Sequence, residues 1–509
     1  MGKEKHYLAL DLGAESGRGM LGTLADGKLS LEEMHRFQTG ATSLPSKYPQ
    51  VAQERKQSDR SYVWDFIRFW CEAKESIQKA SSRASVSSVG VDTWGVDFAL
   101  LDQDGMLLST PFHYRDERTD GMMEAAFKRM PKEQIYEITG IQFMQLNTLF
   151  QLLSMVEQES PILAAAERLV MVPDLLHYWL SGRAVAEFTE ATTTQVFDTR
   201  KGAWSQEIIQ AMGIPHHLFP EVVMPGTVLG PLRASVAEEL GVTMQVVAPP
   251  THDTGCAVAA VPAENDDFIW ISSGTWSIVG MNTPQPVINA ESYHNNFTNE
   301  GGATGNFRFS KNIMGLWLVQ QCRRKWQKEG KELSYTELTN LARKAPAFTT
   351  LIDPDYSGFL KVGDMIEQIH DYCELTGQPF PQDEGAMVRA ILQGLALRYR
   401  FVIEQLEQMS GKQVSTIHIV GGGTQNTLLN QFTADATGKK VITGPIEATA
   451  TGNLVTQAIA MGDIKDWQAG ADVIRASFAI EEYLPKDQAP WNEAYRKFKT
   501  NAEKITLAF

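Results

Sequence analysis

Two features of secreted or membrane-bound proteins are missing from this sequence: paired cysteines and long apolar runs. The 509 residues include only four cysteines, widely spaced and none in a Cys-x-x-Cys pair: Cys71, Cys256, Cys322 and Cys373. Isolated cysteines provide neither a zinc site nor a disulfide framework, so we expect reduced thiols. No apolar stretch approaches the ~18 residues that a membrane-spanning helix needs. Since Asp11 also interrupts the first apolar run after the charged start MGKEK, we expect a cytoplasmic protein without a membrane partner.

Positive charge is also in short supply. The chain has 46 Lys and Arg against 61 Asp and Glu, a net charge of −15. This balance disfavours nucleic acid and anionic membrane surfaces as partners. An anionic ligand such as ATP would then need a local pocket rich in N–H groups or cations. The length is that of two large domains or three smaller ones, and the 43% of hydrophobic residues is ordinary for a globular protein.

Two stretches about half a chain apart share one pattern. Residues 7–22 (YLALDLGAESGRGMLG) and 268–280 (FIWISSGTWSIVG) each contain an apolar strand, a turn of glycine and small hydroxyl residues, and a second apolar run. The backbone N–H groups at the tip of such a hairpin can wrap a phosphate. One hairpin in each half predicts two related domains that bind one nucleotide, and hence phosphoryl transfer.

Hydrophobic periodicity gives the coarse arrangement of elements. Antiparallel strands are expected over 7–38, and two further strands within 86–102. The polar segment 40–60 is predicted to be a loop, and its residues indicate no function. Apolar spacing predicts helices at 62–80, 121–130, 132–138, 147–158, 172–182, about 313–329, 335–345 and 384–410. Hairpins followed by alternating helices and strands, twice along the chain, indicate an α/β fold with mixed sheets.

Asp11 and Asp253 are the first two candidates for chemistry. Asp11 ends a strand just before Gly13, where a carboxylate can hold Mg²⁺ directly or through water, and Arg18 could reach a terminal phosphate oxygen. The alternative for Asp11 is a turn-forming aspartate. Asp253 precedes a small-residue helix, so it is either a helix N-cap or a base that accepts the proton of an attacking hydroxyl. With a reference pKa of about 3.9 it would be a weak base.

Two further groups could recognise a sugar and a nucleotide. Asp92 and Asp97 flank Trp94, and carboxylates suit sugar hydroxyls while an indole face suits a sugar ring; the alternative is a β-turn with a core tryptophan. The glycines of 421–426 (GGGTQN) would let the backbone approach a flat base such as adenine, or they form an ordinary tight turn.

Longer segments resemble the FGGY carbohydrate kinases, whose fold superfamily includes actin, hexokinase and glycerol kinase. The resemblance covers nearly the whole chain, from Leu8 to about Gly462. The segments that carry it are DLGAESGR (11–18), GVDTWGVDFALLD (90–102), YRDERT (114–119), TGIQFMQLNTLFQL (139–152), TEATTTQ (189–195), THDT (251–254), SSGTWS (272–277), TNEGGATGNFRFSKNIMGLWLVQ (298–320) and GGGTQNTLLNQ (421–431). Among these, NIMGLWL and DTWGVDF are much more specific than the glycine turns.

The resemblance implies a role for individual residues. Asp253 matches the catalytic base. The positions that match sugar contacts are Gly95, His252, Thr254 and Asn312, and the residue-based candidates Trp94 and Asp97 join them. Those that match ATP contacts are Ala14, Glu15, Ser16, Gly17 and Arg18 in the first phosphate loop, Thr275 in the second, and Gln320 and Gly422, with Gln425 beside the glycines. Glu15 departs from the pattern, because a small hydroxyl residue is usual there.

The resemblance also implies a fold and a reaction. It implies two ribonuclease-H-like α/β domains, 1–255 for sugar and phosphate and 256–509 for nucleotide, with a cleft that closes on substrate. The implied reaction is phosphorylation of L-rhamnulose to its 1-phosphate with ATP. We expect Mg²⁺ as well, because the pocket must neutralise a triphosphate in a chain of net charge −15, and we expect a monomer or homodimer. The alternatives are a kinase for another ketose, such as L-fuculose or L-xylulose, and a non-catalytic nucleotide-binding protein of the actin-like fold.

Overall fold

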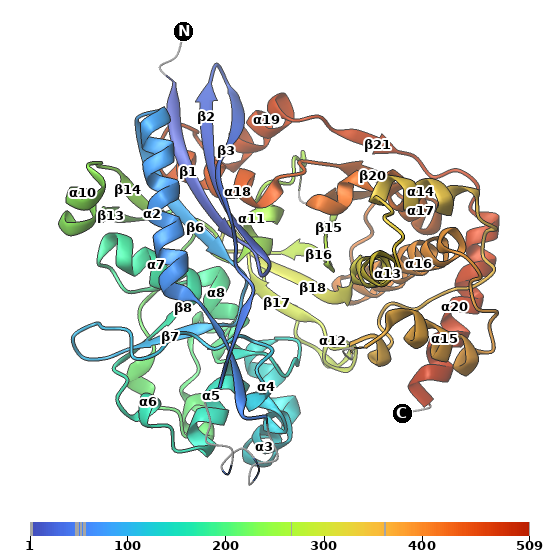
Figure 1. The fold of residues 1–509 in the computed structure, drawn as a ribbon, viewed down its shortest axis with the longest axis horizontal. Helices are drawn as coiled ribbons and strands as arrows, with labels where there is room; N and C mark the ends of the chain where they lie inside the picture. Colours follow the sequence, from blue (N-terminus) through green and yellow to red (C-terminus); the bar gives the residue numbers. More distant parts are fainter. Residues whose placement is uncertain are drawn as a thin grey trace. The chain divides into compact units, whose positions relative to one another are not determined.

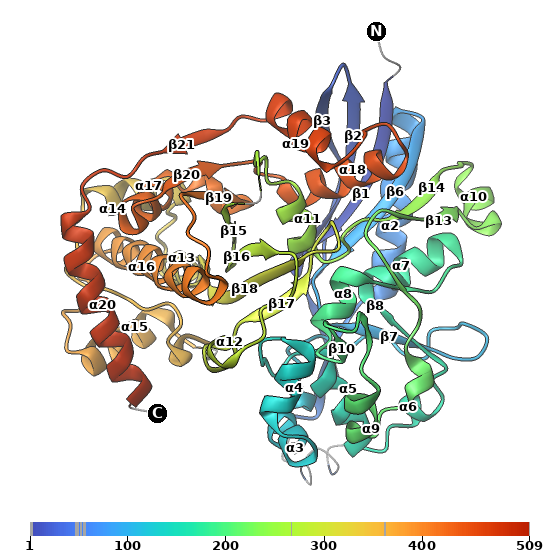
Figure 2. The ribbon, with the colours of Figure 1, turned by 180° about the vertical axis from the view of Figure 1, so that it is seen from behind.

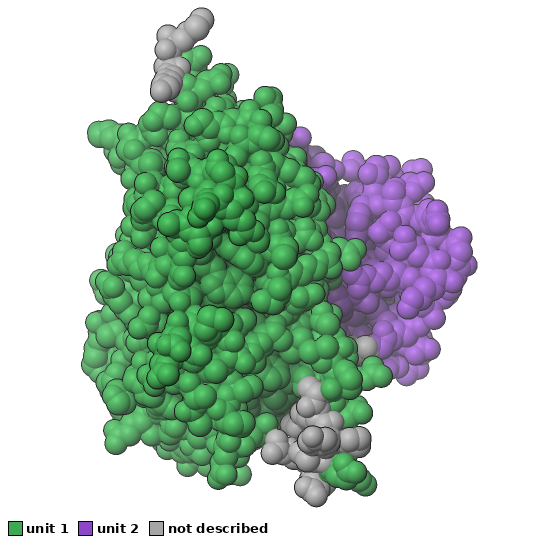
Figure 3. All heavy atoms as spheres, turned by 60° about the vertical axis from the view of Figure 1, so that its left-hand side comes forward, with its two compact units in different colours: residues 1–264, 282–309, 448–478 green, residues 265–281, 310–447, 479–509 purple. Residues whose placement is uncertain are grey.

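The computed structural model describes residues 4–45, 50, 53, 58–265, 267–360 and 363–507. Helices and strands alternate along the chain (Figures 1 and 2), and the described part divides into two compact units (Figure 3). Unit 1 comprises residues 1–264, 282–309 and 448–478, and unit 2 comprises 265–281, 310–447 and 479–509. Each unit is therefore built from three separate segments of the chain. The domain boundary at 255/256 stays a prediction.

Unit 1 is built on a six-stranded sheet with the strand order β13-β14-β6-β1-β2-β3. Its strands are β1 (Lys5–Leu12), β2 (Ser16–Ala25), β3 (Lys28–Gln38), β6 (Val86–Thr93), β13 (Thr227–Pro231) and β14 (Gln245–Ala248). β1, β2 and β3 form an antiparallel meander, whereas β1, β6 and β14 run parallel to one another. The predicted hairpin over 7–22 and the strands over 7–38 are thereby confirmed.

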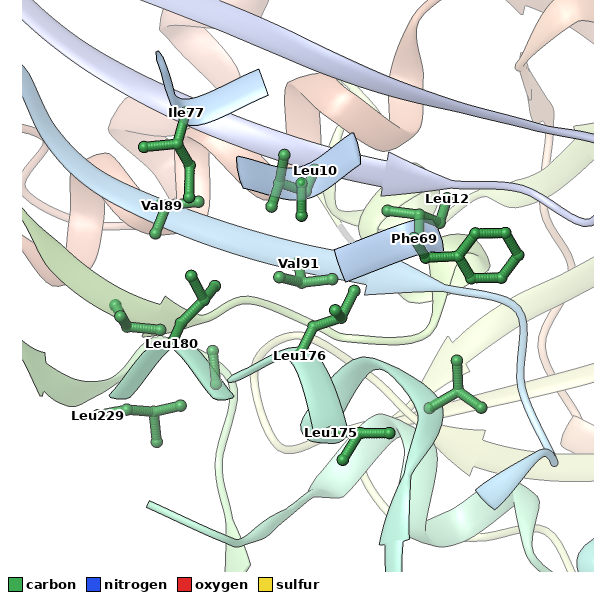
Figure 4. Close-up of a cluster of buried hydrophobic side chains, with 14 of the residues drawn as sticks. Leu10, Leu12, Phe69, Ile77, Val89, Val91, Leu175, Leu176, Leu180 and Leu229 are labelled. Atoms are coloured by element: carbon green, nitrogen blue, oxygen red, sulfur yellow. The ribbon is translucent and has the colours of Figure 1, made fainter. Parts of the chain in front are cut away.

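Helices cover both faces of this sheet. α2 (Phe66–Arg83) and α7 (Val172–Ser181) pack on one face, where Leu10, Val89 and Val91 meet Ile77 and Leu176 in one buried cluster (Figure 4). α18 (Ala448–Ala460) lies on the other face, with Leu454 against Gly22 of β2. Parallel central strands buried on both faces explain why β1 and β6 are almost continuously apolar.

The second sheet, most of which belongs to unit 2, has seven strands in the order β17-β18-β16-β15-β19-β20-β21. They are β15 (Ile269–Ser273), β16 (Trp276–Thr283), β17 (Thr298–Gly301), β18 (Phe307–Met314), β19 (Thr416–Val420), β20 (Lys440–Thr443) and β21 (Glu481–Tyr483). β15 and β16 form the second predicted hairpin, which is confirmed, and β15, β19 and β20 run parallel. The 27-residue α16 (Glu384–Ser410) begins at the N-cap Asp383, whose carboxylate accepts from the Ala386 N–H.

The remaining elements surround these two sheets. The other strands form two-stranded sheets and are β4 (Ala41–Pro45), β5 (Arg60–Trp64), β7 (Phe98–Leu101), β8 (Arg168–Met171), β9 (Ala186–Glu187), β10 (Phe197–Asp198), β11 (Ala203–Trp204) and β12 (Val222–Val223). The α-helices are α3 (Met122–Arg129), α4 (Lys132–Thr139), α5 (Thr148–Glu157), α6 (Pro161–Ala164), α8 (Phe188–Thr193), α9 (Gln206–Met212), α10 (Ala234–Leu240), α11 (Asp253–Ala259), α12 (Ala290–His294), α13 (Trp317–Lys328), α14 (Tyr335–Lys344), α15 (Met365–Thr376), α17 (Thr427–Thr437), α19 (Trp467–Ser477) and α20 (Ala489–Leu507). The short 3₁₀ helices are η1 (Glu117–Thr119), η2 (His216–Leu218), η3 (Ser357–Leu360) and η4 (Gly422–Gln425).

The predicted loop over 40–60 is wrong at its ends, because β4 and β5 pair there as an antiparallel hairpin; most of 46–57 lies outside the described residues. Because β5 continues to Trp64, the helix predicted to begin at residue 62 begins at Phe66. The helix predicted from 313 begins at Trp317, since β18 continues to Met314. Within the described ranges, none of the helices combines the length and the apolar character needed to cross a bilayer.

Candidate functional site

Parallel strands bring the predicted carboxylates of unit 1 to one edge of its sheet. β1, β6 and β14 run in the same direction, so their carboxyl ends, at Leu12, Thr93 and Ala248, face the same way. The loop after β14 returns to this edge, where the Thr93 N–H donates to the Thr251 carbonyl at 2.8 Å. Ligands of open α/β sheets bind at such carboxyl ends, and Asp11, Asp92 and Asp253 are all placed there.

Backbone hydrogen bonds from the two residues that follow β3 hold the turn between β1 and β2. The Thr39 N–H donates to the Glu15 carbonyl at 3.3 Å, and the Gly40 N–H donates to the Ala14 carbonyl at 3.1 Å. A side chain at Gly17 would lie 2.4 Å from the Phe37 ring, so this position requires glycine. The Glu15 side chain is exposed, which keeps its carboxylate in water. The unusual glutamate therefore carries no burial cost in this turn.

Asp11 and Arg18 face each other across the hairpin register and form an ion pair. Arg18 Nη2 lies 2.5 Å from Asp11 Oδ2, and the two side chains are only 18% and 7% exposed. The two residues predicted to hold a metal and a phosphate thus neutralise each other. Within the described parts of the chain, the one compact group of three metal-ligating side chains is an exposed one on α15, His370, Asp371 and Glu374. Asp11 does not belong to such a group.

Asp253 is the first residue of α11, and the N-cap is His252. The interpretation of Asp253 as an N-cap is therefore wrong. Its Oδ1 accepts from the backbone N–H of Thr254 at 2.5 Å and from the Thr254 hydroxyl at 3.1 Å. Although 34% of the side chain stays accessible, the surrounding protein withdraws water from the carboxylate. This burial, reinforced by the charge of Asp11, raises the pKa of Asp253 to about 6, so it is a stronger base than its reference pKa indicates.

Glu187 fixes the loop that carries Asp253. Its Oε2 accepts from the Thr251 N–H at 3.0 Å, from the Thr251 hydroxyl at 2.8 Å and from the Thr189 N–H at 2.9 Å. The His252 N–H donates in turn to the Thr189 hydroxyl at 3.1 Å. Burial raises the pKa of Glu187 to about 7. This buried carboxyl group, which sequence reasoning missed, ties the loop to the start of α8.

Gly95 lies against the imidazole of His252, and their shared role in sugar binding stays a prediction. A Cβ atom at Gly95 would lie 3.1 Å from His252 Nε2 and 3.2 Å from the Thr193 methyl group. Val96 beside it has a φ of 71°, a left-handed conformation that is rare for a β-branched residue. Its N–H donates to the Thr193 hydroxyl at 3.2 Å. The turn after β6 is thus held in a strained shape against the imidazole.

Trp94 and Asp97 lie deeper than a sugar-contacting pair would. Asp97 is fully buried, and its oxygens accept from Trp64 Nε1 at 2.6 Å, Trp94 Nε1 at 3.0 Å and Gln151 Nε2 at 2.8 Å. The Trp94 ring stacks on Trp64 with centroids 3.8 Å apart and is only 6% exposed. Burial raises the pKa of Asp97 to about 6. We therefore propose that this pair supports the turn at Gly95 from beneath.

Asp92 is a third carboxyl group at the same edge. Its Oδ2 accepts from Asn453 Nδ2 on α18 at 2.6 Å, and its Oδ1 has no hydrogen-bond partner among the residues the structure describes. Burial, and then the charge of Asp11, holds the pKa of Asp92 well above its usual range. A buried aspartic acid in the neutral form can donate a hydrogen bond as well as accept one.

Unit 2 gathers the predicted nucleotide residues around the β15–β16 turn. The Thr275 hydroxyl donates to Gln320 Oε1 on α13 at 3.2 Å. The glycine run after β19 packs on the same hairpin, since a Cβ at Gly423 would lie 2.0 Å from Ser273 Oγ. Gly422 is exposed with open space where its side chain would be, and Gln425 is exposed beside it. Both turns lie at the carboxyl ends of parallel strands, as in unit 1.

Asn312 lies on β18 within unit 2, whereas the other predicted sugar residues lie in unit 1. Neighbouring Met314 donates its N–H to Asp355 Oδ1 at 3.3 Å. Two buried side chains of unit 1, Arg308 and Glu300, were not predicted from the sequence. Arg308 Nη2 lies 3.0 Å from His252 Nδ1 and 3.1 Å from Glu300 Oε2. The only feature of the sequence that could have indicated Arg308 is its position between two phenylalanines in a strand-like segment.

The chain belongs to the FGGY family of carbohydrate kinases. Residues 7–259 match the N-terminal domain of this family and residues 269–461 match its C-terminal domain. It is 41% identical over 498 residues to a rhamnulokinase of Bacteroides thetaiotaomicron, with 97% of this chain and 99% of that protein covered. It is also 40% identical to a rhamnulokinase of Oceanobacillus iheyensis, covering 94% of this chain and 97% of that protein.

Solved structures share the fold at low sequence identity. The xylulose kinase of Lactobacillus acidophilus superposes with a TM-score of 0.79 at 15% identity, covering 99% of this chain and 98% of that one. The glycerol kinase of Plasmodium falciparum, solved with ADP, gives a TM-score of 0.78 at 15% identity and covers 99% of both chains. The predicted sugar-kinase α/β fold is thereby confirmed.

Proposed function

We propose that the chain transfers the γ-phosphoryl group of ATP to L-rhamnulose, giving L-rhamnulose 1-phosphate and ADP. Near-full-length identity of 40–41% to proteins named rhamnulokinase supports this substrate. The structural observation that carries the reaction is Asp253: a partly accessible carboxylate at the carboxyl edge of a parallel sheet, held by Thr254, with a pKa of about 6. A base with a pKa near the working pH accepts a proton efficiently.

In this proposal Asp253 orients the attacking hydroxyl of the ketose and takes its proton. Because Oδ1 is engaged by Thr254, we assign the proton to Oδ2. Phosphoryl transfer passes through a loose transition state, so the proton moves late and positioning contributes most of the rate. His252, Gly95 and Thr254 contact the sugar in unit 1. The proposed role of Asn312 in unit 2 is also sugar binding.

The nucleotide residues are proposed in two groups, one for each unit. In unit 1 the triphosphate is bound by the turn that comprises Ala14, Glu15, Ser16, Gly17 and Arg18. In unit 2 the nucleotide is bound by Thr275, Gln320, Gly422 and Gln425. When phosphate binds, Arg18 must exchange part of its ion pair with Asp11 for phosphate oxygens. Bidentate contacts of this kind are typical of arginine.

The residues of unit 1 also fit a magnesium ion. Mg²⁺ takes hard oxygen ligands and is held by one or two carboxylates together with phosphate oxygens and water. Asp11 offers such a carboxylate at the end of β1, 5% exposed, and is not part of a dense ligand cluster. We therefore propose that Asp11 would hold the ion through water; a bound ion would supply charge neutralisation for the transferring phosphate.

A coupled ADP-release assay over a panel of L-ketoses tests the proposal. L-rhamnulose should be turned over with the highest kcat/KM, and equal turnover of L-fuculose or L-xylulose would contradict the narrow assignment. D253N should lose about 10²-fold or more in kcat while retaining ATP affinity. The matched control is D104N, which changes an exposed aspartate in the loop after β7 and should behave as wild type. Full activity of D253N would exclude Asp253 as the base.

A further inference from the structure

Arg308 is a completely buried cation next to the proposed sugar-binding histidine. It lies on the part of β18 that belongs to unit 1 and is 0% exposed. Its Nε donates to the Gly301 carbonyl at 2.8 Å. Its Nη2 has two neighbours, Glu300 Oε2 at 3.1 Å and His252 Nδ1 at 3.0 Å. Gly301 and Glu300 of β17 thus hold the guanidinium, and its Nη2 contacts the imidazole of His252.

The chemistry of this contact determines where the proton of His252 resides. Arginine carries only donors and stays protonated, so a hydrogen bond at 3.0 Å requires a lone pair on His252 Nδ1. The competing arrangement has Nδ1–H donating to Glu300 Oε2, but that distance is 3.6 Å, too long for a hydrogen bond. His252 is therefore neutral, with its hydrogen on Nε2.

The charged groups around the imidazole agree with a neutral ring. They are Asp253 on α11, Glu300 on β17 and Arg308 on β18, with Glu190 on α8 close enough to act on the first two. Burial, and then the charge of Arg308, holds the pKa of His252 well below its usual range. Glu300 compensates the charge of Arg308, so the pair can be buried together without an unpaired ion.

The protonated Nε2 edge lies at the proposed reaction centre. Nε2 is 3.7 Å from Asp253 Oδ1, and a Cβ at Gly95 would lie 3.1 Å from it. The N–H donor is therefore beside the proposed base and against the Gly95 backbone, and the His252 side chain keeps 11% of its surface accessible. A donor here accepts no proton from the sugar and matches only an acceptor atom of it.

We propose that Arg308 is a positioning residue that locks His252 as a neutral Nε2–H donor for an oxygen of the ketose substrate. The role of that donor in sugar binding rests on the proposed function, whereas the tautomer itself does not. The sugar atom facing His252 is then an acceptor, a carbonyl or hydroxyl oxygen. An ammonium group at the same position, as in an amino sugar, would be rejected because two donors would face each other.

Nitrogen chemical shifts of the histidine rings test the tautomer without any substrate. In wild-type protein with ¹⁵N-labelled histidine, the signal missing from H252Q should show an unprotonated Nδ1 and a protonated Nε2. It should not titrate between about pH 5.5 and 8. A protonated Nδ1, or a titration near the ordinary histidine pKa of about 6.5, would overturn the proposal. This measurement stands even if L-rhamnulose proves not to be the substrate.

Kinetics then test the positioning role. R308K keeps the charge but loses the planar fork, so the KM for the ketose should rise by about tenfold while the KM for ATP stays constant. R129K is the control, since Arg129 is an exposed arginine of unit 1 that also bonds a carboxylate, on Glu157, and a backbone carbonyl, that of Met212; it should leave both values unchanged. An unchanged ketose KM in folded R308K would contradict the role of Arg308.

Discussion

Replacing Asp97 with alanine should destabilise unit 1 more than it weakens sugar binding. The substitution leaves three N–H donors without their acceptor, the indoles of Trp64 and Trp94 and the backbone N–H of Tyr114. Gln151 Nε2 loses one acceptor but still donates to the Leu146 carbonyl at 2.8 Å. Each orphaned donor costs about 1–3 kcal/mol, so the loss in the free energy of unfolding should be at least about 3 kcal/mol at pH 7. The measurement is urea unfolding followed by circular dichroism. A direct sugar-binding role would instead raise the ketose KM and leave stability unchanged.

The pH dependence of this loss gives a sharper test. The pKa of Asp97 is about 6 in the folded protein and about 3.9 when unfolded, so between these values the folded state binds more protons. Stability therefore falls as the pH rises through this window. Lowering the pH from 7 to 5 should stabilise wild type relative to D97A by about 1 kcal/mol through this group.

Taking the difference between wild type and D97A at each pH removes the contributions of other titrating groups, such as Glu187 and Asp253, because both proteins contain them. A difference that stays constant from pH 7 to pH 5, or narrows, would refute the burial argument for Asp97. D97A with stability within about 1 kcal/mol of wild type would refute the assignment of the hydrogen-bond network.

Three other perturbations have defined outcomes. Since Asp253 must be ionised to accept a proton, kcat/KM for the ketose should fall about tenfold per unit below pH 6 and level off above it, and a flat profile from pH 5 to 8 would contradict this. D11N should raise the Mg²⁺ concentration for half-maximal rate by about tenfold or more, and a rate that survives EDTA would disprove the metal. G423A should lower Tm, because its Cβ would lie 2.0 Å from Ser273 Oγ, whereas G422A meets nothing within 4 Å and should not; equal calorimetric Tm values would contradict the packing.

The parts of the fold that were predictable depend on short-range signals. Both hairpins could be predicted because the apolar strands and the glycine-containing turn lie within one short segment, as in β15 and β16. The end of α7 was predicted at Gly182, which has a φ of 86°. In each case the residues that decide the structure are neighbours in sequence.

The errors arose where a partner distant in sequence decides the structure. Residues 60–64 carry an apolar pattern that a helix could share, and they become β5 because 41–45 pair with them. No strand was predicted at β21, which pairs with β20 about 40 residues earlier. Strand formation by a short polar segment depends on such pairing more than on its own residues.

The same distinction applies to the site residues. Asp11 and Asp253 were recognisable from their positions after apolar strands, and the sheet brings both to one edge. Asp97 was recognisable as a carboxylate beside Trp94, but its burial depends on Trp64 and Gln151, which lie 33 and 54 residues away. Sequence spacing alone cannot separate a carboxylate that meets a ligand from one that satisfies indole donors.

Burial also explains how a chain with a net charge of −15 can receive a polyanion at an edge lined by acidic residues. Burial is the main cause that holds the pKa values of Asp92 and Glu190 well above their usual range, and it favours the neutral form of both. Arg18 already compensates Asp11. Burial and the Arg18 ion pair therefore both lower the negative charge at this edge, whereas Asp253 must be ionised to act as the proposed base. A triphosphate would meet less repulsion here than the count of carboxyl groups implies.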